Sequence, residues 1–188
     1  MNDILFDTPT AHALQEAKRS AHLQLVDNAY LRPLVEADVS QAYIDGLNDP
    51  VVHKYLVLVR RPPQTRESVE AYVRSNREKL SDILFGLFID NGLKGTVRLH
   101  DIDLENHEEA YIGITLFDVN YWGKGWGWRA ISAVASFGQH SLGIDRILAG
   151  IYPCNTISQR AFFKADFHRT QERGEDDFGV FELWVREN

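Results

Sequence analysis

The sequence predicts an α/β (α+β) fold in which a single mixed sheet is flanked by helices. Segments typical of strands and helices follow one another in the order β-α-α-β-β-β-α-β-α-β-β. Asn91-Gly92 stands between two β-rich runs and is a strong hairpin signal. A strand-like run, three glycines and a helical pattern adjoin directly at 111–142. Hairpins combined with strand–loop–helix connections favour a mixed sheet with helices on both sides.

Length and composition are those of one globular domain. The chain has 188 residues, of which 44% are hydrophobic and 25% are charged. No apolar run approaches the roughly 20 residues that a membrane-spanning helix needs. The N-terminus lacks the basic start and long apolar core of a secretory signal. We therefore expect a cytoplasmic protein with no membrane partner.

Charge and cysteine content exclude several classes of partner. The net charge is −7, and no basic cluster exceeds two residues, so nucleic acid is not expected as a partner. The single cysteine, Cys154, excludes an internal disulfide and a cysteine-rich metal site. The sequence therefore predicts no metal cofactor. It leaves the oligomeric state open, a homodimer included.

The chain begins with a segment that differs from the rest. Residues 1–22 are predicted to form an N-terminal extension, and residues 23–188 a single domain. Ala11 to Ala21 have helix-forming composition, and Pro9 suits the first turn of a helix. The extension is therefore expected to be helical.

The remaining elements are read from hydrophobic periodicity and from residues that cap or break helices and strands. A short strand or hairpin is predicted at 23–31, and further strands at 30–34, 83–90, 93–102, 110–117, 146–152, 167–170 and 180–186. Helices are predicted at 36–47, after the capping residue Thr65, at 131–142 and at 156–165. Turns are predicted at 48–50, 60–64, 153–155 and 173–177.

The glycine segment 123–127 has the chemistry of an anion-binding loop. Glycine allows positive φ and close approach of the backbone, and the first amides of a helix lack internal partners. Lys124 and Arg129 can add positive charge. The spacing is neither that of a dinucleotide-binding loop nor that of a P-loop. A tight strand-to-helix connection without a ligand is the alternative.

The whole string Tyr121-Trp-Gly-Lys-Gly-Trp-Gly127, followed by a helix, resembles the acetyl-coenzyme A (acetyl-CoA) loop of the GNAT N-acetyltransferases. It is most similar to the branch of ribosomal-protein alanine acetyltransferases (RimJ/RimL type). That loop reads Gln/Arg-x-x-Gly-x-Gly/Ala, and here Trp122 takes the first position while Gly125 and Gly127 take the glycine positions. The resemblance covers about 23–186. It implies a mostly antiparallel GNAT sheet whose two central strands splay apart.

A second resemblance lies in Asn155-Thr-Ile-Ser158 and the following Lys164, which are similar to the family stretch Asn-x-x-Ser with a later Lys-x-Gly-Phe. In the family, the Asn contacts the coenzyme arm and the Ser is a proposed proton donor to the departing thiolate. Local capping of the helix is the alternative for both residues. The resemblance implies acetyl-CoA as donor, held by Ile114, Thr115, Leu116, Trp122, Gly123, Lys124, Gly125, Trp126, Gly127, Asn155, Ser158, Phe162 and Lys164.

The sequence departs from the family pattern at positions that bear on catalysis. Phe162 stands where many relatives carry a tyrosine proton donor, and Asp166 replaces a glycine. Tyr111 stands where many carry a glutamate, and strand alternation puts Glu109 on the same face. Ser158, Tyr111 and Glu109 are therefore the candidate catalytic residues.

The missing glutamate favours an acceptor amine of low pKa. Neutralising a lysine at pH 7 costs about 4.6 kcal/mol, whereas a peptide α-amine costs only about 1–1.4 kcal/mol. We expect an N-acetyltransferase that acts by direct attack in a ternary complex, with a protein or peptide N-terminus as acceptor. An amino-sugar nucleotide is the alternative acceptor, and a CoA-binding module with little catalysis is the alternative function. His53, His100 and His107 are bases by pKa alone.

Overall fold

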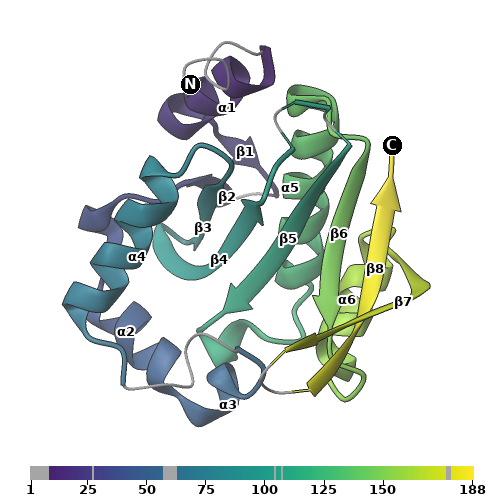
Figure 1. The fold of residues 1–188 in the computed structure, drawn as a ribbon. Coiled ribbons are helices and arrows are strands. Elements are labelled where there is room, and N and C mark those ends of the chain that lie inside the picture. Colours follow the sequence, from purple (N-terminus) through teal and green to yellow (C-terminus); the bar gives the residue numbers. More distant parts are fainter. Residues whose placement is uncertain (1–8, 27, 57–62, 104, 107, 177–178) are drawn as a thin grey trace.

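The computed structural model describes residues 9–26, 28–56, 63–103, 105–106, 108–176 and 179–188. Within them, eight strands form one sheet in the order β1-β2-β3-β4-β5-β6-β8-β7 (Figure 1). Neighbouring strands run antiparallel except β5 and β6, which are parallel. The predicted mixed, mostly antiparallel sheet flanked by helices is therefore confirmed.

The elements agree closely with most of the predicted ranges. The strands are β1 Leu23–Gln24, β2 Ala29–Pro33, β3 Ile83–Ile89, β4 Gly92–His100, β5 Glu109–Leu116, β6 Arg146–Ile151, β7 His168–Asp176 and β8 Gly179–Glu187. The α-helices are α1 Pro9–Ser20, α2 Gln41–Asn48, α3 Pro50–His53, α4 Arg66–Glu78, α5 Trp126–Leu142 and α6 Thr156–Lys164. Short 3₁₀ helices lie at Glu36–Asp38 and Val119–Tyr121.

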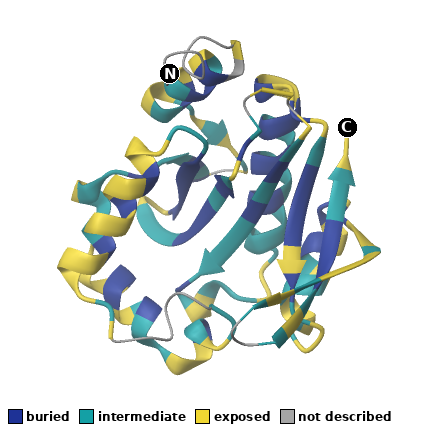
Figure 2. Ribbon diagram, in the orientation of Figure 1, coloured by how far each residue is buried: buried dark blue, intermediate teal, exposed yellow. Residues whose placement is uncertain are grey.

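Hydrophobic side chains fill both faces of the central sheet. Strand β3 illustrates this, because Phe85 and Leu87 join a core with α1, α5 and α6, whereas Leu84 and Phe88 join a second core with α2, α3 and α4. Alternate residues of a strand point to opposite faces, so a strand buried on both sides is hydrophobic throughout. Figure 2 shows the outer side of α4 exposed and its inner side buried. The sheet is therefore the middle layer of three.

The N-terminal helix α1 is packed on the first of these cores. Ala11, Leu14 and Ala17 of α1 are buried there. Near its end, Lys18 Nζ donates to the backbone carbonyls of Asn76 and Arg77, both at 3.2 Å. Burial lowers the pKa of Lys18 to about 8. The predicted helix of the N-terminal segment is confirmed, and it is joined to the end of α4.

The central strands β5 and β6 separate part-way along their length (Figure 1). Their paired residues are Glu109 with Arg146, Ala110 with Ile147 and Tyr111 with Leu148. Beyond this point β5 stays paired with β4 as far as Leu116, and β6 stays paired with β8 as far as Ile151. Residues 112–116 therefore have one backbone edge that faces a gap. This is the splay that the resemblance implied.

The predicted helix at 36–47 is wrong in its first part. Glu36–Asp38 form a 3₁₀ helix, and α2 begins only at Gln41 because the Ser40 hydroxyl accepts from the Tyr43 amide at 3.2 Å. Asp49 does not simply end the helix, since its carboxylate accepts from the Val51 amide at 2.8 Å and starts α3. Most of the predicted turn at 60–64 lies outside the described residues.

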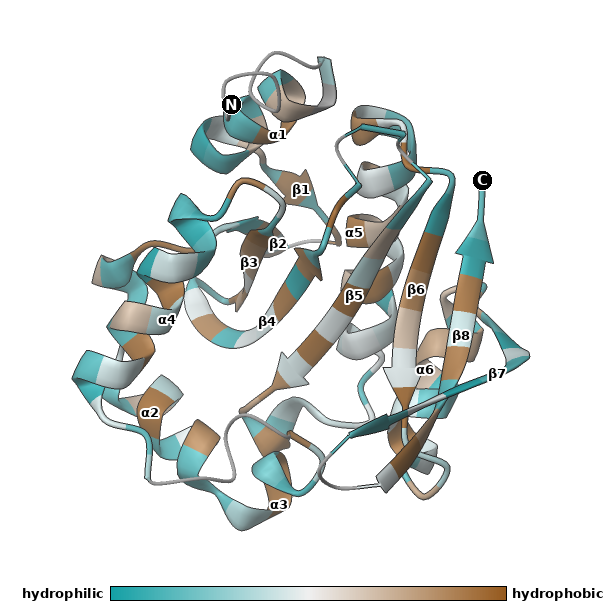
Figure 3. Ribbon diagram, viewed as in Figure 1, coloured by the Kyte–Doolittle hydropathy of each residue, from teal (hydrophilic) through white to brown (hydrophobic). Residues whose placement is uncertain are grey.

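The predicted turn at 173–177 is also wrong. Residues 173–176 continue β7 and pair with β8 from Glu182 to Gly179. Figure 3 shows β7 as a hydrophilic strand beside a more hydrophobic β8. Strand β7 lies at the edge of the sheet, where charged side chains are favoured because they discourage pairing with other molecules. The polar composition of residues 173–176 is therefore that of an edge strand and was interpreted as a turn. Residue 177 lies outside the described residues.

Candidate active site

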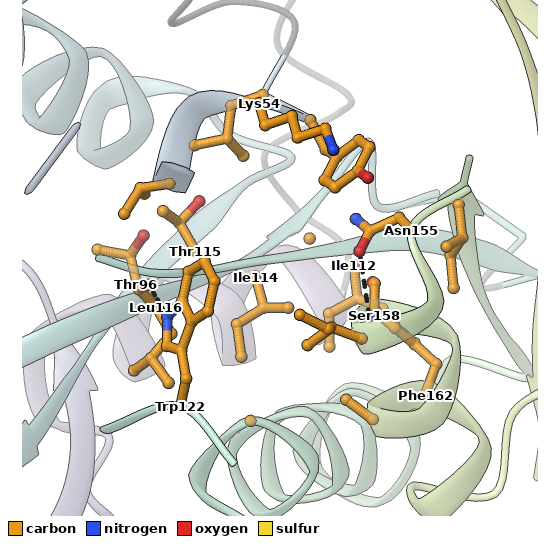
Figure 4. Close-up of a pocket in the computed structure, with 18 of the residues that line it drawn as sticks. Lys54, Thr96, Ile112, Ile114, Thr115, Leu116, Trp122, Asn155, Ser158 and Phe162 are labelled. Atoms are coloured by element: carbon orange, nitrogen blue, oxygen red, sulfur yellow. Dashed lines mark hydrogen bonds between the residues drawn. The ribbon is translucent and has the colours of Figure 1, made fainter. Parts of the chain in front are cut away.

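A cavity of about 540 Å³ opens at the gap between β5 and β6. It is lined by residues 112–116 of β5, by the glycine segment, by the end of β6 and by the start of α6 (Figure 4). Unpaired backbone along β5 can bind an extended ligand in the way that another strand would. The predicted residues Ile114, Thr115 and Leu116 all lie on this wall.

The glycine segment forms one end of the cavity. Gly123 has φ +73° and Gly125 has φ +83°, which are left-handed conformations that favour glycine. Gly125 is the residue that precedes α5, so the amides of 126–128 are the first of the helix and lack intrahelical partners. Trp126 and Gly127 also line the cavity. This end of the cavity therefore has the geometry of an anion-binding site.

Trp122 fixes the glycine segment to the end of β5. Its indole Nε1 donates to the Leu116 carbonyl at 2.7 Å, as Figure 4 shows. Arg129, in the first turn of α5, donates to the Gly125 carbonyl at 3.2 Å. These two bonds hold the loop between the free strand edge and the helix. Trp122, at the first position of the motif, therefore has a structural role that depends on its indole N–H group.

Asn155 and Ser158 lie together at the start of α6 and both line the cavity (Figure 4). The Asn155 Oδ1 accepts from the Ser158 amide at 3.2 Å and caps the helix. The Ser158 hydroxyl makes no hydrogen bond to another described residue. Capping therefore occupies the Asn155 oxygen and leaves the Ser158 Oγ available. Phe162, one turn later, is buried against Phe167 and also lines the cavity.

Four other predicted residues lie away from the cavity lining. Lys124 and Lys164 are exposed, and Lys124 Nζ lies 5.4 Å from the Tyr121 ring centre. Glu109 forms an ion pair with Arg146 at 2.5 Å, at the paired end of β5. Tyr111 neighbours it, and burial together with the charge of Glu109 raises the pKa of Tyr111.

A second cavity, of about 490 Å³, lies on the face of the sheet covered by α2 and α4. Tyr43, Val69 and Tyr72 line it from these helices. Burial raises the pKa of Tyr43 and of Tyr72, so both hydroxyls are protonated at neutral pH. The lining residues that it shares with the first cavity include Thr96, Arg98, His100, Gly113, Thr115 and Gly150. The two cavities therefore meet at the splay.

The second cavity contains a carboxylate that the sequence did not place. Asp176, from β7, accepts from the Tyr152 hydroxyl at 2.5 Å, and both residues line the cavity. The prediction of a turn at 173–177 concealed Asp176, because only the β7–β8 pairing brings it to this cavity. Tyr152 directly follows β6, and no sequence motif marked it as a residue of the site.

Two further residues of this cavity come from β4. Arg98 is ion-paired with Asp82, whose side chain is fully buried. Burial opposes the charge of Asp82, but the hydrogen bonds from Arg98, Lys79 and the Asp101 amide, together with the charge of Arg98, outweigh it and lower the pKa of that carboxyl. His100 Nδ1 lies 2.7 Å from Asp101 Oδ2. The sequence indicated that Arg98 and His100 share one face of this strand, because polar residues alternate with Val97 and Leu99.

Within the described residues, no group of three or more His, Cys, Asp or Glu side chains is arranged to hold a metal ion. The helices that the structure describes include none long and apolar enough to cross a membrane.

The chain is similar to known acetyltransferases. Residues 28–168 match the family model described as "Acetyltransferase (GNAT) domain". The "Probable N-acetyltransferase YjcK" of Bacillus subtilis (strain 168) is 30% identical over 146 residues, which cover 74% of this chain and 80% of that protein.

Solved structures share the fold at low identity. One is RimL, described as a ribosomal L7/L12 alpha-N-protein acetyltransferase in complex with coenzyme A. It has a TM-score of 0.76 at 16% identity and covers 89% of this chain and 98% of its own. Another is AAC(6')-Ib, described as in complex with "Parmomycin and AcetylCoA". It has a TM-score of 0.71 at 20% identity and covers 86% of this chain and 94% of its own.

Proposed function

Because the chain belongs to the acetyltransferase (GNAT) family, we propose that it transfers an acetyl group from acetyl-CoA to a primary amine of low pKa. The proposed acceptor is the α-amine of a protein or peptide N-terminus. One observation carries the proposal: the cavity at the splay of β5 from β6 continues into the second cavity, with which it shares lining residues. A donor in the first cavity and an acceptor in the second can then meet at the same strand edge.

The first cavity fits the donor. The free edge of residues 112–116 can pair with the amide groups of an extended arm, and the amides after Gly125 can bind its pyrophosphate. Asn155 and Phe162 would line the path between these two ends. Lys124 and Lys164, which lie outside the lining, would contribute only through longer-range charge. Bound acetyl-CoA supplies the activated thioester carbonyl.

Ser158 is the residue that we propose as proton donor. Its hydroxyl is available at the cavity wall, and its backbone amide is held by Asn155. A positioned acid of this kind contributes about 10²–10⁴-fold to a rate. Glu109 is held by Arg146 and Tyr111 lies at the paired end of β5. We therefore assign the proton transfer to sulfur to Ser158 ahead of these two candidates.

The second cavity would hold the acceptor. Asp176 and the surrounding tyrosines suit a cationic or polar amine, because a carboxylate and aromatic faces both attract positive charge. About a tenth of a peptide α-amine is neutral at pH 7, compared with a far smaller fraction of a lysine amine. The similarity to RimL, described as an alpha-N-protein acetyltransferase, also favours an N-terminus. We therefore propose that the chain belongs to the RimJ/RimL-type branch.

An amino sugar is the second candidate acceptor. AAC(6')-Ib shares the fold and was solved with an aminoglycoside. Nearby oxygens lower the pKa of a sugar amine, so the same argument from acidity applies. The size and aromatic lining of the second cavity suit either acceptor.

An acceptor comparison tests the proposal. Release of coenzyme A would be measured with an alanine-starting peptide, an amino-sugar nucleotide, spermidine and an N-terminally blocked lysine peptide at equal concentration. The peptide is expected to react fastest. A preference for spermidine or the blocked lysine peptide would contradict the low-pKa acceptor. Binding of acetyl-CoA without turnover of any amine would indicate a binding module instead.

A further inference from the structure

We infer that His100 is the general base of the reaction and that Asp101 is its positioning residue. In this role His100 takes the proton from the acceptor amine, and Asp101 holds the imidazole in the tautomer that this requires. The inference rests on the proposed function and adds a specific residue to it. The sequence offered His53, His100 and His107 without distinguishing them. His107 lies outside the described residues, and His100 lines both cavities, whereas His53 lines neither.

His100 lies where the two cavities meet, and it lines both of them. In the β4–β5 register, His100 is opposite Tyr111 and Arg98 is opposite Gly113. Cross-strand partners share a face, so His100 and Gly113 are diagonal neighbours whose backbone positions are about 7–8 Å apart. A general base must come within about 2.6–3.2 Å of the amine or be bridged to it by one water, and an amine bound between these two positions meets that requirement.

Gly113 leaves room for that approach. A side chain built on it would meet no heavy atom within 4 Å. Gly113 is also among the first residues of β5 beyond the last pair with β6. The space above it is therefore open to an acceptor in the second cavity and adjoins the free strand edge. His100 lies on the neighbouring strand β4, diagonally opposite this opening.

Asp101 determines which imidazole nitrogen is basic. Its Oδ2 lies 2.7 Å from His100 Nδ1. A carboxylate only accepts hydrogen bonds, so Nδ1 carries the proton and Nε2 carries the free lone pair. Lys79 Nζ lies 3.1 Å from the other oxygen of Asp101 and holds it in place. The Tyr111 ring stacks on the imidazole at 5.8 Å between centres, which fixes its plane.

The charges around His100 keep it neutral at physiological pH. Burial lowers the pKa of His100 from its ordinary value of 6.5; the positive charge of Arg98 lowers it further, while Asp101 and Asp82 oppose the shift. The other titratable or charged side chains around it, by contact or shared cavity, are Lys79, Tyr111, Tyr72, Tyr152 and Asp176. Because the folded pKa lies below 6.5, Nε2 is unprotonated at neutral pH. Its basic form is lost only as the pH falls through that lowered value.

The proton transfer balances within the reaction. The neutral amine forms the N–C bond to the acetyl carbonyl carbon, and its surplus proton moves to His100 Nε2. The C–S bond breaks with its electron pair going to sulfur, and sulfur takes a proton either directly from solvent or from Ser158, which regains a proton from solvent. His100 then returns its proton to solvent. A base with a pKa under 6.5 matches an α-amine near 8 better than a lysine near 10.4.

The first measurement is kcat/KM for the alanine-starting peptide between pH 5 and 9. For the native protein, a logarithmic plot is expected to have a slope of one below the amine pKa of about 8 and a slope of two below the His100 pKa. His100→Gln is expected to lose about 10²-fold at pH 8 and to keep a slope of one throughout.

Two further variants complete this measurement. Asp101→Asn keeps a residue that tolerates the positive φ of this position (49°) and is expected to lose about tenfold. His140→Gln, an exposed histidine on α5, is the matched control and should behave as the native protein. Calorimetry with acetyl-CoA and thermal melting establish that each variant is folded.

The second measurement does not depend on turnover. The ¹⁵N chemical shifts of His100 report which nitrogen carries the proton, and a protonated Nδ1 that shifts toward the other tautomer in Asp101→Asn supports the inference. A protonated Nε2 in the native protein would overturn it. So would a slope of two that persists in His100→Gln, or that disappears only in Asp176→Asn. If the native protein acetylates no amine at all, the proposed function itself fails, whatever the variants show.

Discussion

The two cavities that meet at the splay are built in different ways. The first is defined largely by backbone: the free edge of β5, two left-handed glycines and the first amides of α5. The second is defined by side chains from separate elements, among them Tyr43 of α2, Val69 of α4 and Asp176 of β7. Backbone geometry is insensitive to most substitutions, whereas a side-chain surface changes with each one. The difference suits a constant donor on one side and a selected acceptor on the other.

The largest effect is expected for a substitution at Ser158, which should change the rate of the chemical step but not the binding of acetyl-CoA. Ser158→Ala is expected to lower the rate of the chemical step by about 10²-fold or more, because the variant lacks the positioned hydroxyl. The affinity for acetyl-CoA should stay the same, since the Ser158 amide and its bond to Asn155 are retained. Single-turnover kinetics and calorimetry measure the two quantities.

Ser141→Ala is the matched control, because Ser141 is exposed near the far end of α5. Full activity of Ser158→Ala, under conditions in which the chemical step limits the rate, would reduce Ser158 to a structural residue of the first helical turn.

The second prediction compares the two ends of α5. Gly125→Val places a branched side chain at φ +83° beside the first amides of the helix and should weaken acetyl-CoA binding at least tenfold. Gly143→Val places the same side chain at φ +71° at the other end. Both variants should lose stability through the same backbone strain, about 1–2 kcal/mol each.

Only Gly125→Val should lose affinity in calorimetry. Equal affinities in the two folded variants would show that the glycine segment is a tight connection without a role in holding the donor.

The smallest effect is expected on the acceptor side. Asp176→Asn should raise KM for a peptide acceptor about fivefold, because a partly exposed charge pair contributes at most about 1 kcal/mol. The affinity for acetyl-CoA should not change. Glu175→Gln, exposed on the opposite face of β7, removes the same charge outside the cavity and is the control. An equal change in both variants would indicate a general electrostatic effect instead of contact in the second cavity.

The regions that the sequence predicted well are those in which neighbours along the chain interact. The strand at 109–116, the glycine segment and α5 are consecutive, so their pattern is readable without knowledge of the fold. The predicted hairpin and the Thr65 cap depend on interactions within a few residues and are both present, although the two turn residues of the hairpin are Asp90 and Asn91 and Gly92 already begins β4. The predictions failed at 36–47 and 173–177. The polar residues of these segments are compatible with more than one local structure.

The sequence alone therefore determined the family, the mixed sheet and the wall of the first cavity, because each depends on a contiguous motif or on hydrophobic periodicity. Tertiary structure alone determined the second cavity. Asp176 enters the second cavity only through the pairing of β7 with β8, and His100 reaches the splay only through its register with β5. These two residues are 76 positions apart in the sequence. The physical reason is that a single sheet brings distant strands to one edge, and no local pattern in the chain records which strands will be neighbours.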